Sequence, residues 1–240
     1  MKTEYKIHNL SDVINAYTAQ KVINGKLQDI GGRRDMTTEL EIMKAVLSSS
    51  LSDSQKAEMI VVGGHQHRLQ CTKAAAAKTL LVKTMEKGKL WKNSYTGKTF
   101  EDLYDDIENL LKTNNCTYAG QITKYDFAKR IGVFVNCLPN SFVYLHSGAL
   151  IGAQRLLGVF NLKEGKYPIG LFSKYFSSLN AMEIEDILCV FHNIYDCGGV
   201  TIRHFFDDSI TLACHAFFPS PGTKNDVNNV LIKNNLPIIK

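Results

Sequence analysis

The chain has 240 residues, of which 45% are hydrophobic and 21% are charged, and its formal net charge is +5. This balance is typical of a globular protein and excludes extended disorder, and no apolar run approaches the ~20 residues that a bilayer span requires. The N-terminal sequence MKTEYKIHNL has no apolar stretch typical of a secretory signal, so we expect a cytoplasmic protein without membrane association.

Most of the predicted elements are helices. Residues 36–49 and 71–88 have helical spacing or composition, and the second of these contains four consecutive alanines and ends at Gly88. Helices are also predicted at residues 99–113, 123–135 and 180–192. In four of the five, a capping residue is followed three residues later by an acid, which is typical of a helix start. These pairs are Thr38 with Glu41, Thr99 with Asp102, Thr123 with Asp126, and Asn180 with Glu183.

Strand-like alternation is scarce, so the sequence predicts a mostly α fold with few or no strands. Residues 209–217, SITLACHAF, fit a strand or a buried helix, because periodicity does not separate the two. Residues 220–225, SPGTKN, are typical of a loop, and we expect the tail 235–240 to be weakly ordered or docked on the body. The lysine-rich stretch that ends near Lys98 is the best internal boundary. It predicts two helical lobes, residues 1–98 and 99–240.

The charge is unevenly distributed along the chain. Between Gln66 and Thr99 there are eight basic residues and one acid, Glu86. A run of this kind is compatible with an electrostatic footprint for phosphates, and equally with a solvated helix face. The sequence leaves both interpretations open.

Residues 117–132, TYAGQITKYDFAKRIG, indicate a tight turn around Gly120 that leads into a helix. Such a turn brings backbone N–H groups together at a helix N-terminus, and glycine lets an anion approach the backbone closely. We therefore predict a phosphate contact here. Its predicted residues are Ala119, Gly120, Gln121, Thr123, Lys124, Lys129 and Arg130. An ordinary pair of helices joined by a glycine-containing turn is the alternative.

This stretch resembles the hairpin and second helix of the helix-hairpin-helix superfamily, although Tyr118 stands where the family prefers a first glycine. The following segments CLPNSFVYLHSGALIGAQRLLG and EIEDILCVFHN resemble bacterial proteins of the 8-oxoguanine DNA glycosylase fold. The resemblance covers residues 99–193.

The resemblance implies a ligand held in a cleft between two helical lobes. The ligand would be DNA or a modified, guanine-like nucleobase, and the lining residues would be Tyr144, His146, Ser147 and Arg155. Such proteins are similar to accessory components of anti-phage operons of the CBASS type, so the resemblance also implies operon proteins as partners.

Catalysis by the family's own residues is not expected in this chain. In the bifunctional glycosylases that it resembles, a lysine on the hairpin helix attacks the sugar and a later aspartate supports the reaction. Ile122 and Tyr144 stand at the matching positions. Lys124, Asp126 and Asp186 are candidate substitutes in an N-glycosylase that acts on a damaged or modified purine.

No metal site or cofactor is expected. No standard zinc-finger spacing is matched by the scattered ligand types Cys189, His192, Cys197, His204, Cys214 and His215. A second class of function remains open, in which the chain is a non-catalytic interaction module that docks on a protein partner and does not bind DNA. The two classes differ in salt dependence, because phosphate contacts weaken steeply with added salt.

Overall fold

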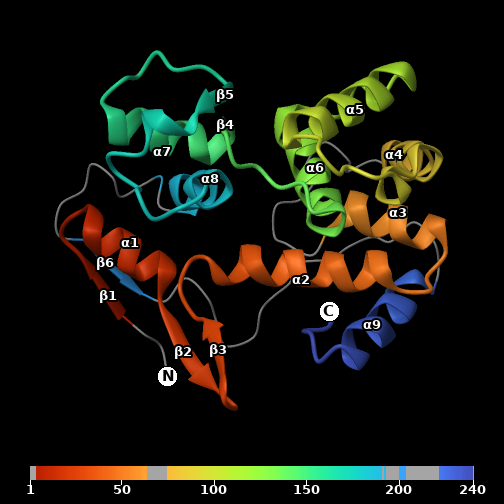
Figure 1. Ribbon diagram of the computed structural model, residues 1–240, viewed down its shortest axis with the longest axis horizontal. Coiled ribbons are helices and arrows are strands. Elements are labelled where there is room, and N and C mark those ends of the chain that lie inside the picture. The colour runs from red at the N-terminus through yellow and green to blue at the C-terminus, as the bar shows by residue number, and fades with distance from the viewer. Residues whose placement is uncertain (1–3, 64–74, 191, 193–199, 204–221, 240) are drawn as a thin grey trace. The chain divides into compact units, whose positions relative to one another are not determined.

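The computed structural model describes residues 4–63, 75–190, 192, 200–203 and 222–239. It confirms a mostly helical chain, shown in Figure 1. The chain divides into two compact units, each made of two separate stretches. Unit 1 is Met1–Thr37 with Pro139–Ile210, and unit 2 is Thr38–Leu138 with Thr211–Lys240. The boundary expected near Lys98 lies inside unit 2.

Unit 1 combines short strands with helices. Its described elements are β1 (Glu4–Ile7), α1 (Leu10–Thr18), β2 (Gln20–Ile23), β3 (Lys26–Asp29), β4 (Phe142–Leu145), α7 (Ser147–Leu157), β5 (Gly165–Pro168), the 3-10 helix η3 (Ile169–Leu171), α8 (Ala181–Val190) and β6 (Val200–Arg203). The strands form three two-stranded antiparallel sheets, β1 with β6, β2 with β3, and β4 with β5. Six four-residue strands are more than the expected few or none, and each is too short to give a clear alternation in the sequence.

The β2–β3 hairpin has a sequence signal that hydrophobic periodicity does not reveal. Its two-residue loop is Asn24–Gly25, and both residues have positive φ, 51° and 75°. Asn-Gly between two short apolar-containing runs is the strongest local sign of a hairpin, because both loop positions of a type I′ turn need positive φ. The hairpin is therefore encoded locally.

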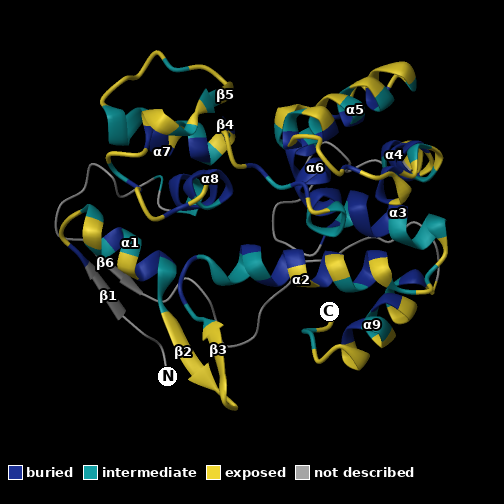
Figure 2. Ribbon diagram, in the orientation of Figure 1, coloured by how far each residue is buried: buried dark blue, intermediate teal, exposed yellow. Residues whose placement is uncertain are grey.

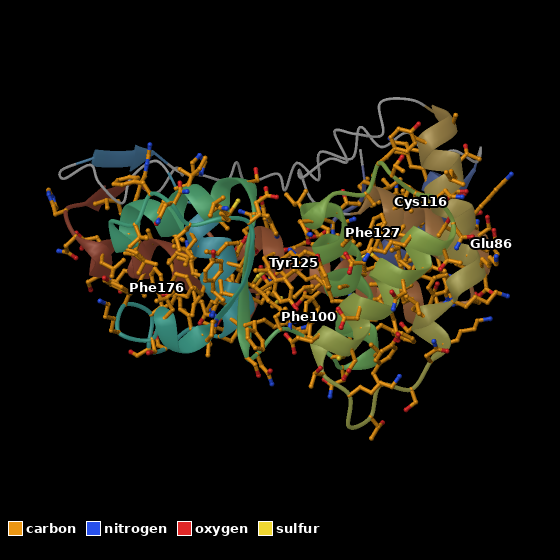
Figure 3. The ribbon with its side chains drawn as sticks, turned by 90° about the horizontal axis from the view of Figure 1, so that it is seen from above. Glu86, Phe100, Cys116, Tyr125, Phe127 and Phe176 are labelled. Atoms are coloured by element: carbon orange, nitrogen blue, oxygen red, sulfur yellow. The ribbon has the colours of Figure 1, made fainter. Side chains whose placement is uncertain are left out.

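The core of unit 1 lies where α7 packs against α8. Small residues on α7 allow the two backbones to approach closely, since a Cβ atom on Gly152 would overlap the carbonyl of Leu188. Ala149 and Ala153 of the same face are fully buried. Further apolar side chains complete this core, among them Phe176, which Figure 3 labels.

All the described secondary-structure elements of unit 2 are helices. Its elements are most of α2 (Arg34–Ser48), α3 (Asp53–Val62), α4 (Ala75–Gly88), the 3-10 helix η2 (Leu90–Lys92), α5 (Phe100–Thr113), α6 (Gln121–Val135) and α9 (Thr223–Lys233). Helix α6 is the central element, because most of its residues between 123 and 132 are buried (Figure 2). The rings of Phe100 and Tyr125 meet edge to face with their centroids 5.9 Å apart (Figure 3). This aromatic contact joins α5 to α6.

Two of the predicted helix starts are confirmed and two are wrong. Thr99 and Asp102 form a reciprocal capping box, and Asn180 exchanges backbone–side-chain hydrogen bonds with Glu183. Helix α2, however, begins at Arg34, so Thr38 is an interior residue rather than a cap. Helix α6 begins at Gln121, which places Thr123 in its first turn and leaves Gly120 as the N-cap.

The C-terminal expectations have mixed outcomes. Segment 209–217 lies outside the described residues. Residues 223–225 of the expected loop belong to α9, which begins immediately after Gly222. The tail is docked, because Ile239 is buried and both its N–H and its carbonyl are hydrogen-bonded to the side chain of Asn228. None of the helices in the described ranges is both long and apolar enough to cross a membrane.

Candidate functional site

The predicted phosphate-contact turn is the connection between α5 and α6, residues 114–120, which we call the hairpin turn. Its chain is held by local hydrogen bonds, including one from the N–H of Cys116 to the carbonyl of Leu111 at 2.9 Å. Gly120 is exposed, and no side chain caps the N-terminus of α6. The first amides of a helix have no intrahelical acceptor, so they remain the natural donors for an anion.

Glycine at position 120 is not required by the protein itself. Its φ is −72°, which any residue adopts, and a Cβ atom there would meet nothing within 4 Å. Several other glycines of the chain are needed for close packing or for a positive φ. Gly120 therefore differs from them, and the open space around it would let an anion approach the backbone closely.

Lysines and acids lie together beside the hairpin turn. Glu108 of α5 accepts hydrogen bonds from Lys124 at 2.6 Å and lies 3.2 Å from the ammonium of Lys112. The hydrogen bond from Lys124, with a second from Lys112, holds the pKa of Glu108 below its ordinary value. Lys87 donates to the side chain of Asn114 at 3.5 Å, within the turn. Three lysines therefore lie beside the turn, but Glu108 is paired with two of them, and the charges of Glu108 and Asp105 act on Tyr104, which binds Gln121 at the start of α6.

The other two basic residues of α6 point into unit 2 rather than toward solvent. Arg130 is only 1% exposed, and its guanidinium donates to Glu39 at 2.8 Å and to the carbonyl of Ile60 at 2.8 Å. Gly63, with a φ of 72°, packs directly against this guanidinium, where a Cβ atom would overlap it. The expected role of Arg130 as a phosphate contact thus gives way to a structural role, because a fully buried guanidinium cannot reach a ligand.

Lys129 and Asp126 belong to the same buried network. The ammonium of Lys129 lies 3.8 Å from Asp126 and 5.4 Å from the ring centre of Tyr125, while Asp126 lies 3.9 Å from Arg130. Lys129 is 7% exposed. The interpretation of Asp126 as a helix cap is wrong, and its carboxylate instead serves two buried cations.

The remaining predicted residues of the turn region differ in accessibility. Ala119 and Thr123 are buried, whereas Gln121 is exposed and hydrogen-bonded to the hydroxyl of Tyr104. Lys124 is half-buried. The accessible part of the predicted set is therefore the backbone at Gly120 with Gln121 and the edge of Lys124.

The residues of the VYLH segment form a second group, in unit 1. Tyr144 lies on β4 and His146 precedes α7, and both are buried. The Nε2 atom of His146 lies 3.9 Å from a carboxylate oxygen of Glu185 on α8. Ser147 is exposed with a φ of 47°, and Arg155 donates to the carbonyl of His192 at 2.8 Å. This segment positions side chains inside the unit 1 core, with Ser147 at its surface.

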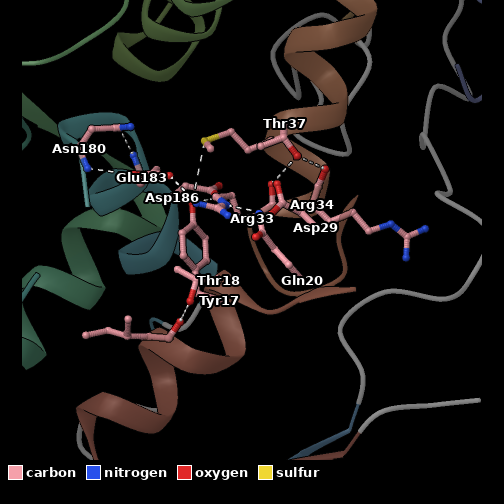
Figure 4. A network of polar contacts seen from close by, with 12 residues as sticks. Tyr17, Thr18, Gln20, Asp29, Arg33, Arg34, Thr37, Asn180, Glu183 and Asp186 are labelled. Atoms are coloured by element: carbon pink, nitrogen blue, oxygen red, sulfur yellow. Dashed lines mark hydrogen bonds and ion pairs between the residues drawn. The ribbon is translucent and has the colours of Figure 1, made fainter. Parts of the chain in front are cut away.

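Asp186 forms part of a polar network that the sequence did not predict (Figure 4). The hydroxyl of Tyr17 on α1 donates to Asp186 at 2.8 Å, and burial with this carboxylate raises the pKa of Tyr17 well above its ordinary value. Nearby, Arg33 bridges Asp29 at 2.7 Å and Glu183 at 3.0 Å. Tyr17 and Asp186 are 169 positions apart, so no spacing in the sequence could have found their contact.

The predicted site residues therefore fall into two groups, one in each unit. In the part of the chain that the structure describes, no cluster of three or more histidine, cysteine or acidic side chains is arranged to hold a metal ion. Four of the scattered ligand types lie outside that part, namely Cys197, His204, Cys214 and His215. Comparison with protein-family models, curated proteins and solved structures gives no match.

Proposed function

We propose that the chain binds nucleic acid through the phosphate backbone, with the hairpin turn as the contact. The observation that carries this proposal is Gly120, an exposed helix N-cap at which neither φ nor packing requires glycine. The uncapped amides of α6 and the three lysines beside the turn support it, because both favour an anion. The proposed contacts to phosphate are the turn backbone and the side chains of Lys87, Lys112 and Lys124.

The resemblance to the 8-oxoguanine DNA glycosylase fold supplies the ligand class in this proposal. We propose DNA or a guanine-like modified nucleobase as the ligand, and an accessory role in anti-phage defence. Chemistry by a lysine nucleophile is disfavoured, because Lys124 is held in an ion pair with Glu108 and an ammonium has no electron pair for attack. Binding without lyase chemistry is the form of the proposal that fits these contacts.

Fluorescence anisotropy with labelled duplex and single-stranded DNA, with and without 8-oxoguanine, tests the proposal across a salt series. Gly120→Ala should weaken binding, because the added methyl blocks close approach of a phosphate to the α6 amides. Gly170→Ala is the matched control, since Gly170 is also exposed, has no positive φ and has open space around it. Lys112→Met should lower the slope of log affinity against log salt by about 1.

The proposal fails if no binding is seen at low salt, or if Gly120→Ala and Gly170→Ala have the same affinity as the unaltered chain. An affinity that is insensitive to salt would also exclude phosphate as the ligand, because counterion release is unavoidable when lysines neutralise phosphates.

A protein-interaction module is the second candidate, and the burial of Lys129 and Arg130 favours it. Because these two cations of α6 are paired inside unit 2, fewer positive charges remain at the hairpin turn for a nucleic acid. Such a module would co-purify with its partner and keep it at moderate salt, whereas a phosphate contact would be lost.

A further inference from the structure

The β2–β3 hairpin exposes apolar side chains at its tip. Val22 and Leu27, which are directly paired across the two strands, are 63% and 64% exposed. Figure 2 shows the hairpin as one of the most exposed parts of the chain. Single exposed apolar residues are ordinary, but a cross-strand pair of them on a short sheet is a surface suited to contact with another strand.

The base of this hairpin is firmly attached to unit 1. Gln20 donates to Asp29 at 2.8 Å across the strands, and Asp29 is paired with Arg33 at 2.7 Å (Figure 4). Directly after the hairpin, Gly31 lies so close to α1 that a Cβ atom would overlap the carbonyl of Ala16. The tip is therefore held out on an anchored base, which lowers the entropy that a partner must overcome on binding.

The two faces of the hairpin differ in chemistry. The register places Val22 and Leu27 on one face, and Lys21, Ile23 and Lys26 on the other. Both lysines are exposed, and among the described residues no carboxylate forms an ion pair with either of them. Within the same residues the sheet consists of β2 and β3 alone, so each strand has an outer edge of unused backbone donors and acceptors.

We propose that an extended segment of another protein, with alternating apolar and acidic side chains, adds to an edge of this hairpin as a third strand. Its apolar side chains would continue the face of Val22 and Leu27, and its acids would lie on the face of Lys21 and Lys26. Backbone hydrogen bonds supply affinity in this mode and the alternating side chains supply specificity. The proposal is independent of nucleic-acid binding at the hairpin turn.

Charge favours a different protein over a second copy of this chain. Antiparallel pairing of two identical edges about a two-fold axis preserves the faces of the sheet. It therefore gathers Lys21 and Lys26 of both copies on one face, where like charges oppose pairing. An acidic partner strand would instead be attracted to Lys21 and Lys26 of the single copy.

NMR titration of the full chain with a capped peptide of about eight residues, a usual strand length, tests the proposal. The probe alternates valine with glutamate. One control alternates valine with lysine, and another has the composition of the probe in two blocks. The probe should shift the backbone amides of residues 20–29 and slow their hydrogen exchange, and neither control should do so.

Variants give the expected magnitudes. Lys21→Glu combined with Lys26→Glu should weaken the valine–glutamate peptide on the order of tenfold and create binding of the valine–lysine peptide. Val22→Thr combined with Leu27→Thr should also weaken it while keeping residues that suit strands. An unchanged urea midpoint and unchanged amide shifts outside residues 20–29 establish that each variant is folded.

Three outcomes would overturn the proposal. One is the absence of any shift at millimolar peptide, and another is an equal response to the block peptide. The third is a dimer in sedimentation that the Val22→Thr and Leu27→Thr variant dissociates, which would assign the edge to a second copy. Gly120→Ala should leave peptide binding unchanged. A failure of nucleic-acid binding at residues 114–120 is therefore distinguishable from a failure of strand addition at the β2–β3 hairpin.

Discussion

Replacing Arg130 by methionine should strongly destabilise unit 2. The substitution keeps most of the side-chain volume but removes the donor to Glu39 and to the carbonyl of Ile60, each at 2.8 Å, and the cation 3.9 Å from Asp126. Glu39 is 2% exposed and Asp126 is 9% exposed, so their charges cannot be compensated by water. Breaking a buried ion pair on one side typically costs about 3–5 kcal/mol of unfolding free energy.

The sole tryptophan reports on the unit concerned. Trp91 is buried in η2 of unit 2, so its fluorescence during urea unfolding follows this unit. With a slope of about 2 kcal/mol per molar urea, the expected loss shifts the midpoint by roughly 2 M. Lys112→Met is the control, because its side chain is 66% exposed and its ion pair with Glu108 should contribute no more than about 1 kcal/mol.

Arg130→Lys keeps the prediction testable if the methionine variant does not fold. Lysine retains the charge but loses the planar fork that reaches Glu39 and Ile60 together, so an intermediate loss of stability is expected. A midpoint shift below about 0.5 M in Arg130→Met, accompanied by loss of DNA affinity, would refute the reasoning, because it would mean that the guanidinium is available to phosphates.

Three further predictions concern both units. Gly152→Ala should destabilise unit 1 by about 1–3 kcal/mol in circular-dichroism melts, because the new methyl overlaps the carbonyl of Leu188. This cost should exceed the gain from the better helix propensity of alanine. Unchanged stability would contradict the close α7–α8 approach. Borohydride reduction with an abasic duplex should trap no covalent complex, and a robust cross-link lost in Lys124→Ala would reverse the view of its ion pair as unreactive. Tyr17→Phe should cost about 1–3 kcal/mol at neutral pH, because it deprives Asp186 of a buried donor. The raised pKa of Tyr17 contributes stability that is fully present below about pH 10 and is lost as pH rises toward the folded-state pKa. Between pH 9 and 12, the unfolding free energy from urea titrations should therefore fall less steeply with pH in Tyr17→Phe than in the unaltered chain. An identical fall would argue against burial of this hydroxyl.

Local features of this protein were predictable from the sequence. The caps at Thr99 and Asn180 and the end of α4 at Gly88 follow from interactions within four residues, and all three are confirmed. The errors have local causes as well. Thr38 and Thr123 have the residue pattern of a cap, but their helices begin upstream, at Arg34 and Gln121.

The direction of each charged side chain was decided only by the tertiary structure. Lys129 and Arg130 are the residue types found on phosphate-binding helix faces, yet both are buried against acids. Arg130 meets Glu39 across 91 positions and Tyr17 meets Asp186 across 169. Spacing in the sequence carries no information about such pairs, because their members come into contact only when the chain folds.

The assignment of chain segments to the two units was also decided only by the tertiary structure. Residues 1–37 join residues 139–210 in unit 1, so the N-terminal segment is completed by chain that follows the whole of α3 to α6. A boundary drawn from composition near Lys98 marks a change in local charge and not a change in packing. Helix type and helix ends are set by neighbours a few residues away, and the sequence determines them directly. Which helices share a core, and which charges they enclose, depends on burial between distant segments, and only the folded chain decides it.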